Sequence, residues 1–192
     1  IAPRVNAAGR IRNGKTAVDW MLSSNDQEIK QLAQEIHNDN TLRRTIDQSI
    51  TEEALLQISN DKDHSKHCTN LVFQSDWHKG VVGIVASKIQ DQYFRPTIIL
   101  TESHGQLVGS ARSVRGFDVH HALEECADLL EQFGGHTHAA GLHLKPENLQ
   151  AFIEKFEGIA QLGLANISPR ADLPVDLQIP LEALSLSFYD KL

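Results

Sequence analysis

The strongest constraint on the fold is the stretch 26–58, which contains neither glycine nor proline. Its apolar residues, among them Ile29, Leu32, Ile36 and Ile50, keep helical spacing. At 1.5 Å per residue, a helix of this length spans roughly 50 Å. The apolar stripe is narrow, the other faces are charged, and the heptad drifts, so the pattern favours a bridging helix over a coiled coil.

Beyond residue 69 the pattern changes to alternating strands and helices. Strands are predicted at 70–74, 97–101, 106–113 and 142–144, with a helix around 81–89. Further helices are expected from Asp118 to Leu130 and from Lys145-Pro146-Glu147 to Gly163, and then a strand at 175–179 and a helix at 181–192. A short helix is expected at 16–22. The predicted fold class is therefore α/β, a small mixed sheet flanked by helices and preceded by a long connecting helix.

Bulk properties limit the possible classes of protein. The chain has 192 residues and a formal net charge of -7, and its two cysteines, Cys68 and Cys126, make no disulfide framework. Two thiols in a chain of this size favour a reducing compartment, so a cytoplasmic location is expected. We find no signal peptide and no apolar run of the roughly 18 residues that a membrane helix needs. The chain starts at Ile1 within a patterned segment, which suggests a piece of a longer protein.

Several short segments combine phosphate-type donors with small residues. These are Arg4, Asn6 and Arg10; Ser110, Arg112 and Ser113; and Gly134, Gly135 and His136. His78 and Lys79 add positive charge where a strand, a glycine-bearing turn and a helix follow one another. Taken singly, three of these segments have a structural alternative. Arg4, Asn6 and Arg10 could form a solvated basic arm, the stretch after residue 133 could be a helix C-cap with a turn, and His78 and Lys79 could stand in a plain strand–helix connection. Together they predict a site for a phosphate or a nucleic-acid backbone.

Metal and nucleophile chemistry is less well supported. His64, His67 and Cys68 have no apparent fourth ligand for zinc. The sequence shows no cluster of Asp and His residues of the kind that a two-metal phosphodiesterase needs. Cys126 falls on the apolar face of its predicted helix, which indicates core packing rather than a nucleophile. We therefore predict no metal ligand set in this chain.

Four motifs resemble the RecJ family of single-strand-specific exonucleases, in the DHH phosphoesterase superfamily. They occur in the family's order and cover nearly the whole chain: Ala2-Pro-Arg-Val-Asn-Ala-Ala-Gly-Arg10, Trp77-His-Lys-Gly-Val-Val-Gly-Ile-Val-Ala-Ser87, Gly109-Ser-Ala-Arg-Ser113 and Gly134-Gly-His-Thr-His-Ala-Ala-Gly141. The resemblance implies a preceding catalytic domain, which holds two divalent metals (Mn²⁺ or Mg²⁺) and is absent from this chain. It also implies that an oligonucleotide-binding barrel follows.

The resemblance further assigns parts of this chain. It implies an interdomain basic arm at 1–24, a long connecting helix at 25–62, a DHH-associated substrate-binding domain at 63–163 and a connector at 164–192.

By motif position, the resemblance implies that Ser110, Arg112 and Ser113 hold the DNA backbone. Gly134 and Gly135 would border the cleft, and His136 would face the scissile phosphate. The resemblance likewise places Arg4, Asn6 and Arg10 along the substrate channel.

The function expected from this resemblance is substrate binding for a 5′-to-3′ exonuclease that acts on single-stranded DNA in repair and recombination. The chain by itself is expected to be inactive. Two alternatives remain at this point: a DHH phosphodiesterase for short oligonucleotides or cyclic dinucleotides, and a non-catalytic interaction module built on the long acidic helix.

Overall fold

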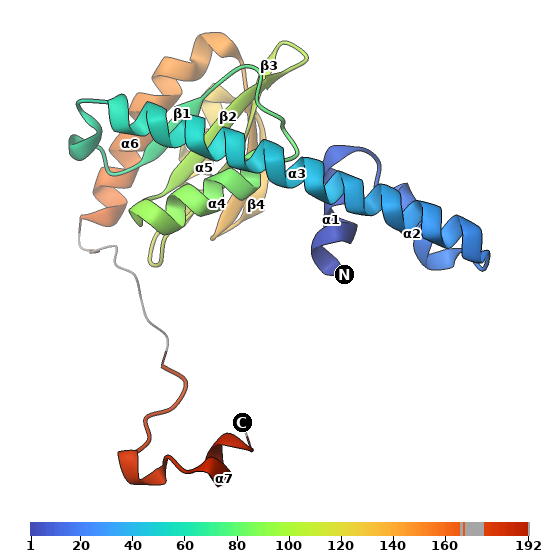
Figure 1. Ribbon diagram of the computed structural model, residues 1–192. Helices are drawn as coiled ribbons and strands as arrows, with labels where there is room; N and C mark the ends of the chain where they lie inside the picture. Colours follow the sequence, from blue (N-terminus) through green and yellow to red (C-terminus); the bar gives the residue numbers. More distant parts are fainter. Residues whose placement is uncertain (166, 168–174, 192) are drawn as a thin grey trace.

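The computed structural model describes residues 1–165, 167 and 175–191. Two short helices precede one very long helix, which leads into a five-stranded sheet with helices on both faces (Figure 1). The α-helices are α1 (Ala2–Ile11), α2 (Lys15–Leu22), α3 (Asp26–Asn60), α4 (Val82–Tyr93), α5 (Val119–Glu125), α6 (Leu149–Leu164) and α7 (Leu186–Tyr189). The strands are β1 (Asn70–Phe73), β2 (Thr97–Ser103), β3 (Gln106–Arg112), β4 (Leu130–His136) and β5 (Ala139–Leu144). Single turns of 3₁₀ helix lie at His64–Lys66 (η1), Ala127–Leu129 (η2), Pro146–Asn148 (η3) and Leu181–Ala183 (η4).

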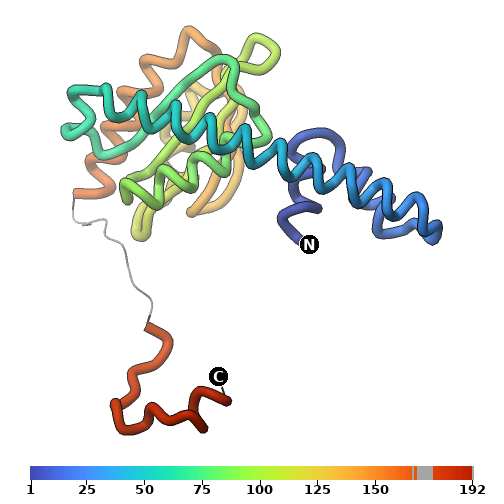
Figure 2. The backbone as a smooth tube through the Cα atoms, in the orientation of Figure 1, coloured from blue at the N-terminus to red at the C-terminus, as the bar shows by residue number. Residues whose placement is uncertain are grey.

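The long helix predicted from the stretch 26–58 is confirmed as α3, of 35 residues, capped by the side chain of Asn25. Its first half contacts α1 and α2, and its second half packs against α4 and the edge strand β1 (Figure 2). Ile36 joins Ala8 and Ala17 in a small apolar cluster, whereas Ile50 and Ile58 belong to a core shared with α4 and the sheet. The helix therefore bridges two separate apolar clusters, as its narrow stripe predicts.

Buried ion pairs also hold α3 against its neighbours. The sequence pattern did not predict them, because the charged faces of this helix were expected to be solvated. Asp39 is 1% exposed, and its Oδ1 lies 2.9 Å from Arg12 Nε, just after α1. Asp47 is 4% exposed and pairs with Lys88 of α4 at 2.8 Å and with Arg43 at 3.4 Å. Two carboxylates of a face expected to be solvated thus tie α3 to its neighbours.

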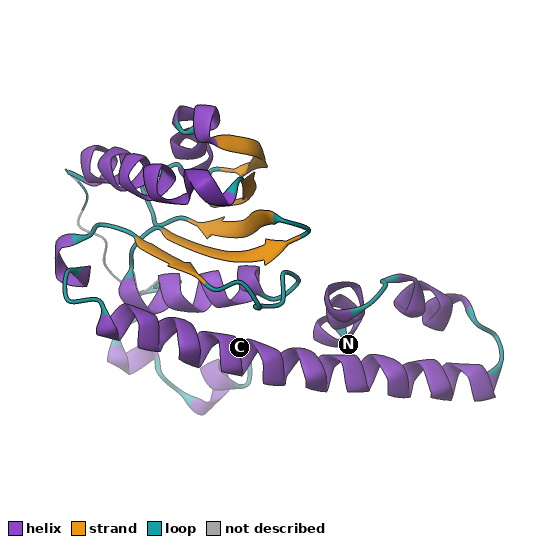
Figure 3. Cartoon of the chain, turned by 90° about the horizontal axis from the view of Figure 1, so that it is seen from above, coloured by secondary structure: helices purple, strands orange, loops and turns teal. Residues whose placement is uncertain are grey.

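The sheet has the strand order β1-β2-β3-β5-β4, with β1 parallel to β2 and the remaining pairs antiparallel. Figure 3 shows the sheet between two layers of helices. Helices α5 and α6 cover one face, with Phe117 just before α5 and Phe152 and Phe156 of α6 in the core, and α3 and α4 cover β1 and β2 on the other. The predicted α/β class, a mixed sheet flanked by helices after a long helix, is confirmed.

A tight hairpin turn at Ser103-His104-Gly105 joins β2 to β3. His104 and Gly105 have φ values of 55° and 77°, and Ser103 pairs with Gln106. Positive φ at both central residues is the signature of a type I′ turn, whose twist matches that of the flanking strands.

The prediction for residues 118–136 was wrong in two respects. The helix capped by Asp118 ends at Glu125 instead of Leu130, and Gly134, Gly135 and His136 lie in strand β4, not in a helix C-cap. Gly135 pairs with Ala140 so closely that a Cβ added to Gly135 would lie 2.3 Å from the carbonyl oxygen of Ala139. The glycine is needed because two backbones approach each other here.

The C-terminal predictions are only partly met. Residues 175–179 form no strand, and the helix expected at 181–192 reduces to η4 and the single turn α7, with residue 192 outside the described range. Within the connector predicted at 164–192, residues 166 and 168–174 also lie outside the described residues. Val175 and Leu177 are exposed, so the alternation of apolar residues at 175–179 has no buried partner here.

Candidate nucleic-acid interface

A basic cavity forms where β3, the start of α4, the loop after β1 and the end of α1 meet. Its volume is about 550 Å³. Arg10, Lys79 and Arg112 line it together with His104, His143 and Ser110, and no described lining residue is an Asp or a Glu. Three segments far apart in the sequence therefore bring positive charge to one concave surface.

Arg112 is the most firmly held of these cations. Its Nε donates to Ser87 Oγ of α4 at 2.9 Å, and its Nη1 donates to Ser110 Oγ at 2.7 Å and to the carbonyl of Ala111 at 2.8 Å. Burial, and then the nearby Arg10, lower the pKa of Arg112. The structure shows no carboxylate paired with Arg112 among the described residues. A fixed guanidinium without a counter-ion favours binding of an anion.

Gly83 of α4 makes room for this arrangement. A Cβ at Gly83 would lie 3.0 Å from Arg112 Nη2 and 3.1 Å from Ser110 Oγ. Val81, the N-cap of α4, makes no side-chain cap hydrogen bond, and Val82 and Gly83 of the first turn line the cavity. The first N–H groups of a helix attract anions, so α4 adds to the positive potential of the arginines.

Arg10 reaches the cavity by close contact between α1 and the loop 77–80. Its Nη1 donates to the carbonyl of Gly80 at 3.3 Å. A Cβ on Gly80 would lie 2.2 Å from the carbonyl oxygen of Arg10, so only glycine lets the two backbones come this near. The N–H of Gly80 donates to His78 Nδ1 at 3.1 Å, and this turns the His78 ring toward its own loop.

The loop 77–80 is also anchored by the long helix α3. Trp77 is 5% exposed, and its Nε1 donates to Glu53 Oε2 of α3 at 2.8 Å. Thr101 Oγ1 of β2 donates to the carbonyl of Trp77 at 2.7 Å. Lys79, two residues on, extends over the cavity, and its Nζ donates to Ser103 Oγ at 3.3 Å.

Beside the cavity, the pairing of β3, β5 and β4 forms a flat surface of small residues. Ser110 pairs with Gly141, which pairs with Gly134, and Arg112 pairs with Ala139, which pairs with His136. Paired residues share one face of a sheet, so His136 lies in the row of Arg112, two strand spacings or roughly 10 Å away. Gly134 has open space above it, since an added Cβ would meet nothing within 4 Å. Small residues therefore leave a flat floor between Arg112 and His136.

The structure does not bring every predicted residue to this site. Ser113 Oγ donates to the carbonyls of Phe117 and Val114, at 2.6 and 3.3 Å, because Ser113 follows the strand and is not in register with Ser110 and Arg112. Arg4 and Asn6 are exposed on α1 and do not line the cavity. His78 shapes the loop and is likewise not a lining residue.

Three contributors were missed by reading the sequence. Ser87 holds Arg112, and its only local signal is its position one helical turn after Gly83. His143 and Gln106 line the cavity because strand alternation places them on the same face as Ser110. That face could be assigned only once the strand pairing was known.

The residues considered for metal or nucleophile chemistry have structural partners. His64 Nε2 lies 2.9 Å from Asn70 Oδ1, and the His64 carbonyl accepts from Arg95. Over the part of the chain that the structure describes, no three His, Cys, Asp or Glu side chains are grouped to hold a metal. Cys126 lies in the main core, as predicted, and burial raises its pKa to about 11. No described helix is both long and apolar enough to cross a membrane.

Residues 65–162 match the family described as the DHHA1 domain. The chain belongs to the DHHA1 family. The matched range covers the sheet and most of α6, and it includes Lys79, Ser110, Arg112 and His136.

The relatives of this DHHA1 chain confirm the resemblance to RecJ. RecJ of Bacillus subtilis (strain 168), a single-stranded-DNA-specific exonuclease, is 40% identical over 162 residues, which are 83% of this chain and 20% of the relative. RecJ of Escherichia coli (strain K12), with the same description, is 35% identical over 164 residues, 81% of this chain and 28% of the relative. The chain thus spans well under a third of the length of these relatives.

Solved structures agree with the DHHA1 assignment. RecJ from Thermus thermophilus in complex with Mn²⁺ superposes with a TM-score of 0.75 at 30% identity, over 84% of this chain and 24% of that one. The Mg²⁺ complex of RecJ from the same organism gives a TM-score of 0.76 over 88% of this chain and 25% of that one.

Proposed function

We propose that this chain is the part of a RecJ-type exonuclease that holds single-stranded DNA. The observation that carries the proposal is the basic cavity, where Arg10, Lys79 and Arg112 converge and no described carboxylate lines the wall. A DNA backbone carries one negative charge per nucleotide, and guanidinium groups match phosphate oxygens bidentately.

In this proposal Arg112 and Ser110 bind the phosphate backbone, with Arg10 and Lys79 beside them. The single-stranded DNA then runs over the small residues Gly141 and Gly134 toward His136, which would face the scissile phosphate. Gly135 borders this path on the same strand as His136. Arg4 and Asn6 are proposed to extend the basic track along α1. We leave the Ser113 hydroxyl out of the proposed contacts because it is bonded to the backbone of its own turn.

Hydrolysis in this proposal belongs to a longer protein. The RecJ structures similar to this chain are complexes with Mn²⁺ or Mg²⁺, but the described residues of this chain offer no matching ligand set. We propose that the metals and the 5′-to-3′ cleavage reside in a catalytic domain preceding residues 1–24, and that an oligonucleotide-binding barrel follows residues 164–192. Residues 25–62 would connect that domain to the substrate-binding domain at 63–163. Work in DNA repair and recombination in the cytoplasm is part of the same proposal, and both cysteines are free, as expected in a reducing compartment.

The test is titration of an oligothymidylate of about 12 nucleotides by fluorescence anisotropy, since single-strand sites usually cover about 4–16 nucleotides. The affinity should fall as salt rises from about 50 to 200 mM, with a slope set by the number of phosphates contacted. A length series from dinucleotides upward is the second arm. Preference for dinucleotides would favour the phosphodiesterase alternative, and the absence of any salt-dependent binding would favour the interaction module.

A further inference from the structure

A second cavity lies at one edge of the sheet, along strand β1. In the parallel pair β1–β2, the N–H of Asn70 donates to the carbonyl of Pro96 and the N–H of Gln74 donates to that of Leu100. Because alternate residues of a strand bond to the same neighbour, the N–H and C=O groups of Leu71 and Phe73 point away from β2. Neither N–H has a hydrogen-bond partner among the residues that the structure describes. Strand β1 therefore presents an open edge.

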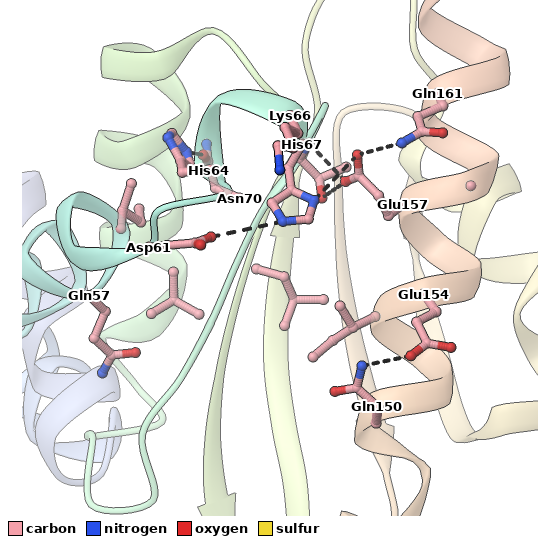
Figure 4. Close-up of a pocket in the computed structure, with 16 residues that line it drawn as sticks. Gln57, Asp61, His64, Lys66, His67, Asn70, Gln150, Glu154, Glu157 and Gln161 are labelled. Atoms are coloured by element: carbon pink, nitrogen blue, oxygen red, sulfur yellow. Dashed lines mark hydrogen bonds and ion pairs between the residues drawn. The ribbon is translucent and has the colours of Figure 1, made fainter.

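This edge lies in a groove between the two helical layers. The cavity is about 560 Å³, with Leu71 and Val72 on its floor and Gln57, Ile58 and Asp61 of α3 and the adjoining turn on one wall. The other wall is a stripe of α6 that repeats at helical spacing: Gln150, Ile153, Glu154, Glu157, Gly158 and Gln161. A further strand would lie about 4.8 Å from β1, between these walls. Figure 4 shows the labelled side chains of both walls around this space.

One end of the edge is already closed by the protein itself. Glu157 accepts from the N–H groups of Cys68 and Thr69, at 2.6 and 3.1 Å, and from Thr69 Oγ1 at 2.6 Å. Thr69 is the next outward-facing position before Leu71, so the carboxylate takes the place of a neighbouring strand there. The outward-facing main-chain groups of Leu71 and Phe73, which follow Thr69, remain available to another polypeptide.

The charge of the groove selects the kind of occupant. Among the described residues that line it, Asp61, Glu154 and Glu157 are acidic and one is a lysine, Lys66, which is itself paired with Asp63. The two ring nitrogens of His67 each lie 3.9 Å from a carboxylate, of Asp61 and of Glu157 (Figure 4). The C-terminal end of α3 adds further negative potential. This environment repels a nucleic-acid backbone and suits a cationic peptide.

We propose that the β1 groove binds an extended, positively charged segment of a partner polypeptide, which adds to the five-stranded sheet as a sixth strand. The main-chain groups of Leu71 and Phe73 would supply the hydrogen bonds, and the apolar floor with its acidic rim would select alternating apolar and basic side chains. The inference does not depend on DNA binding at the basic cavity.

Gly158 offers a variant that blocks the groove without disturbing the fold. It is exposed on the groove wall, and an added Cβ meets nothing within 4 Å. Leucine is also a better helix former than glycine in the interior of α6. Gly158→Leu should therefore fold normally while its side chain fills the space of the added strand. Thermal unfolding of the variant checks the first point.

The probe is a hexapeptide of alternating lysine and valine, titrated into the 192-residue chain. We expect saturable binding by anisotropy, slower hydrogen exchange of the Leu71 and Phe73 amides by NMR, and at least tenfold weaker binding to Gly158→Leu. A glutamate–valine hexapeptide and a lysine–proline hexapeptide, which lacks half of the N–H donors, are the matched controls and should bind at least tenfold more weakly.

Several results would overturn the proposal. They are no saturable binding of the lysine–valine peptide, equal binding of the glutamate–valine peptide, and unchanged binding to Gly158→Leu. Protection of the Leu71 and Phe73 amides by oligothymidylate would instead assign the groove to nucleic acid.

Discussion

The basic cavity, over the central strand β3, and the groove along the edge strand β1 use charge in opposite ways. At the basic cavity, Arg112 is held by Ser87, Ser110 and a backbone carbonyl, none of which neutralises it. At the β1 groove, the buried carboxylate of Glu157 is occupied by the chain's own N–H and O–H groups. The difference teaches that a buried charge satisfied by the protein's own N–H and O–H groups serves stability, whereas a fixed charge that lines an open cavity without a counter-ion is available to a ligand.

The largest expected effect is on stability, at the β1 groove. Glu157→Ala leaves the N–H groups of Cys68 and Thr69 without their acceptor, and Thr69 is buried. We expect a loss of about 3 kcal/mol in the free energy of unfolding, typical of removing several hydrogen bonds to a charged group. Urea denaturation measures it. Glu154→Ala, at an exposed position in the same stripe of α6, is the control and should change stability by less than about 0.5 kcal/mol. Similar values for the two variants would contradict the structural role of Glu157.

The next effect is on binding, at the basic cavity. Arg112→Ala should weaken binding of oligothymidylate by about 1–3 kcal/mol, or roughly 5- to 150-fold, because a charge-assisted contact to phosphate is lost. Anisotropy titration gives the affinity. Arg112→Lys should have an affinity between those of the unchanged chain and Arg112→Ala, because lysine keeps the positive charge but lacks the bidentate guanidinium group. Arg44→Ala removes the same charge from an exposed position of α3 outside the cavity. If Arg44→Ala weakened oligothymidylate binding as much as Arg112→Ala, the effect of Arg112 would be explained by the loss of one positive charge, not by a contact in the cavity.

A third prediction concerns how α1 is held against the basic cavity. Gly80→Ala places a Cβ 2.2 Å from the carbonyl oxygen of Arg10, so α1 must shift. Overpacking of this kind costs about 1–3 kcal/mol in the free energy of unfolding. DNA affinity should fall with it, since Arg10 moves away. Gly134→Ala, with open space around the new methyl group, should leave the melting temperature unchanged. If Gly80→Ala were equally harmless, the close approach of α1 to the loop would be disproved.

The smallest effect tests whether the long helix supports the cavity. Glu53→Ala removes the acceptor of the Trp77 indole N–H, with an expected cost of about 1 kcal/mol in stability. DNA affinity should fall severalfold because the loop that carries Lys79 loses its anchor. Glu53→Gln keeps an oxygen acceptor and should restore most of the affinity, and Glu52→Ala is the control on the adjacent residue. A variant Glu53→Ala with unchanged DNA affinity would show that Trp77 is held well enough by Thr101 alone.

Much of the fold was readable from local pattern. The period of the apolar residues and the absence of breakers determined α3, and alternating strand and helix patterns predicted β1, α4, β2 and β3. These features depend on residues close in sequence, which is why composition and periodicity report them. The segments that supply Arg10, Lys79, Ser110 and Arg112 were likewise predictable, because donor groups beside small residues are a local signal. The pattern failed at 175–179, where alternation alone did not produce a strand.

What the tertiary structure alone decided is which of these groups meet. Gly134 and Gly135 suggested a helix cap until strand pairing with β5 placed them on a sheet edge, opposite Gly141 and Ala140. Ser113 differs from Ser110 only by lying one residue past the strand, yet its hydroxyl binds backbone instead of facing the cavity. The roles of Glu157 and Ser87 depend on contacts across 88 and 25 residues of sequence. The sequence by itself determined α3, α4, the strands β1 to β3 and the donor groups they carry, because these follow from short-range periodicity. Register and packing decided their partners, because a shift of one residue turns a side chain to the opposite face of the sheet.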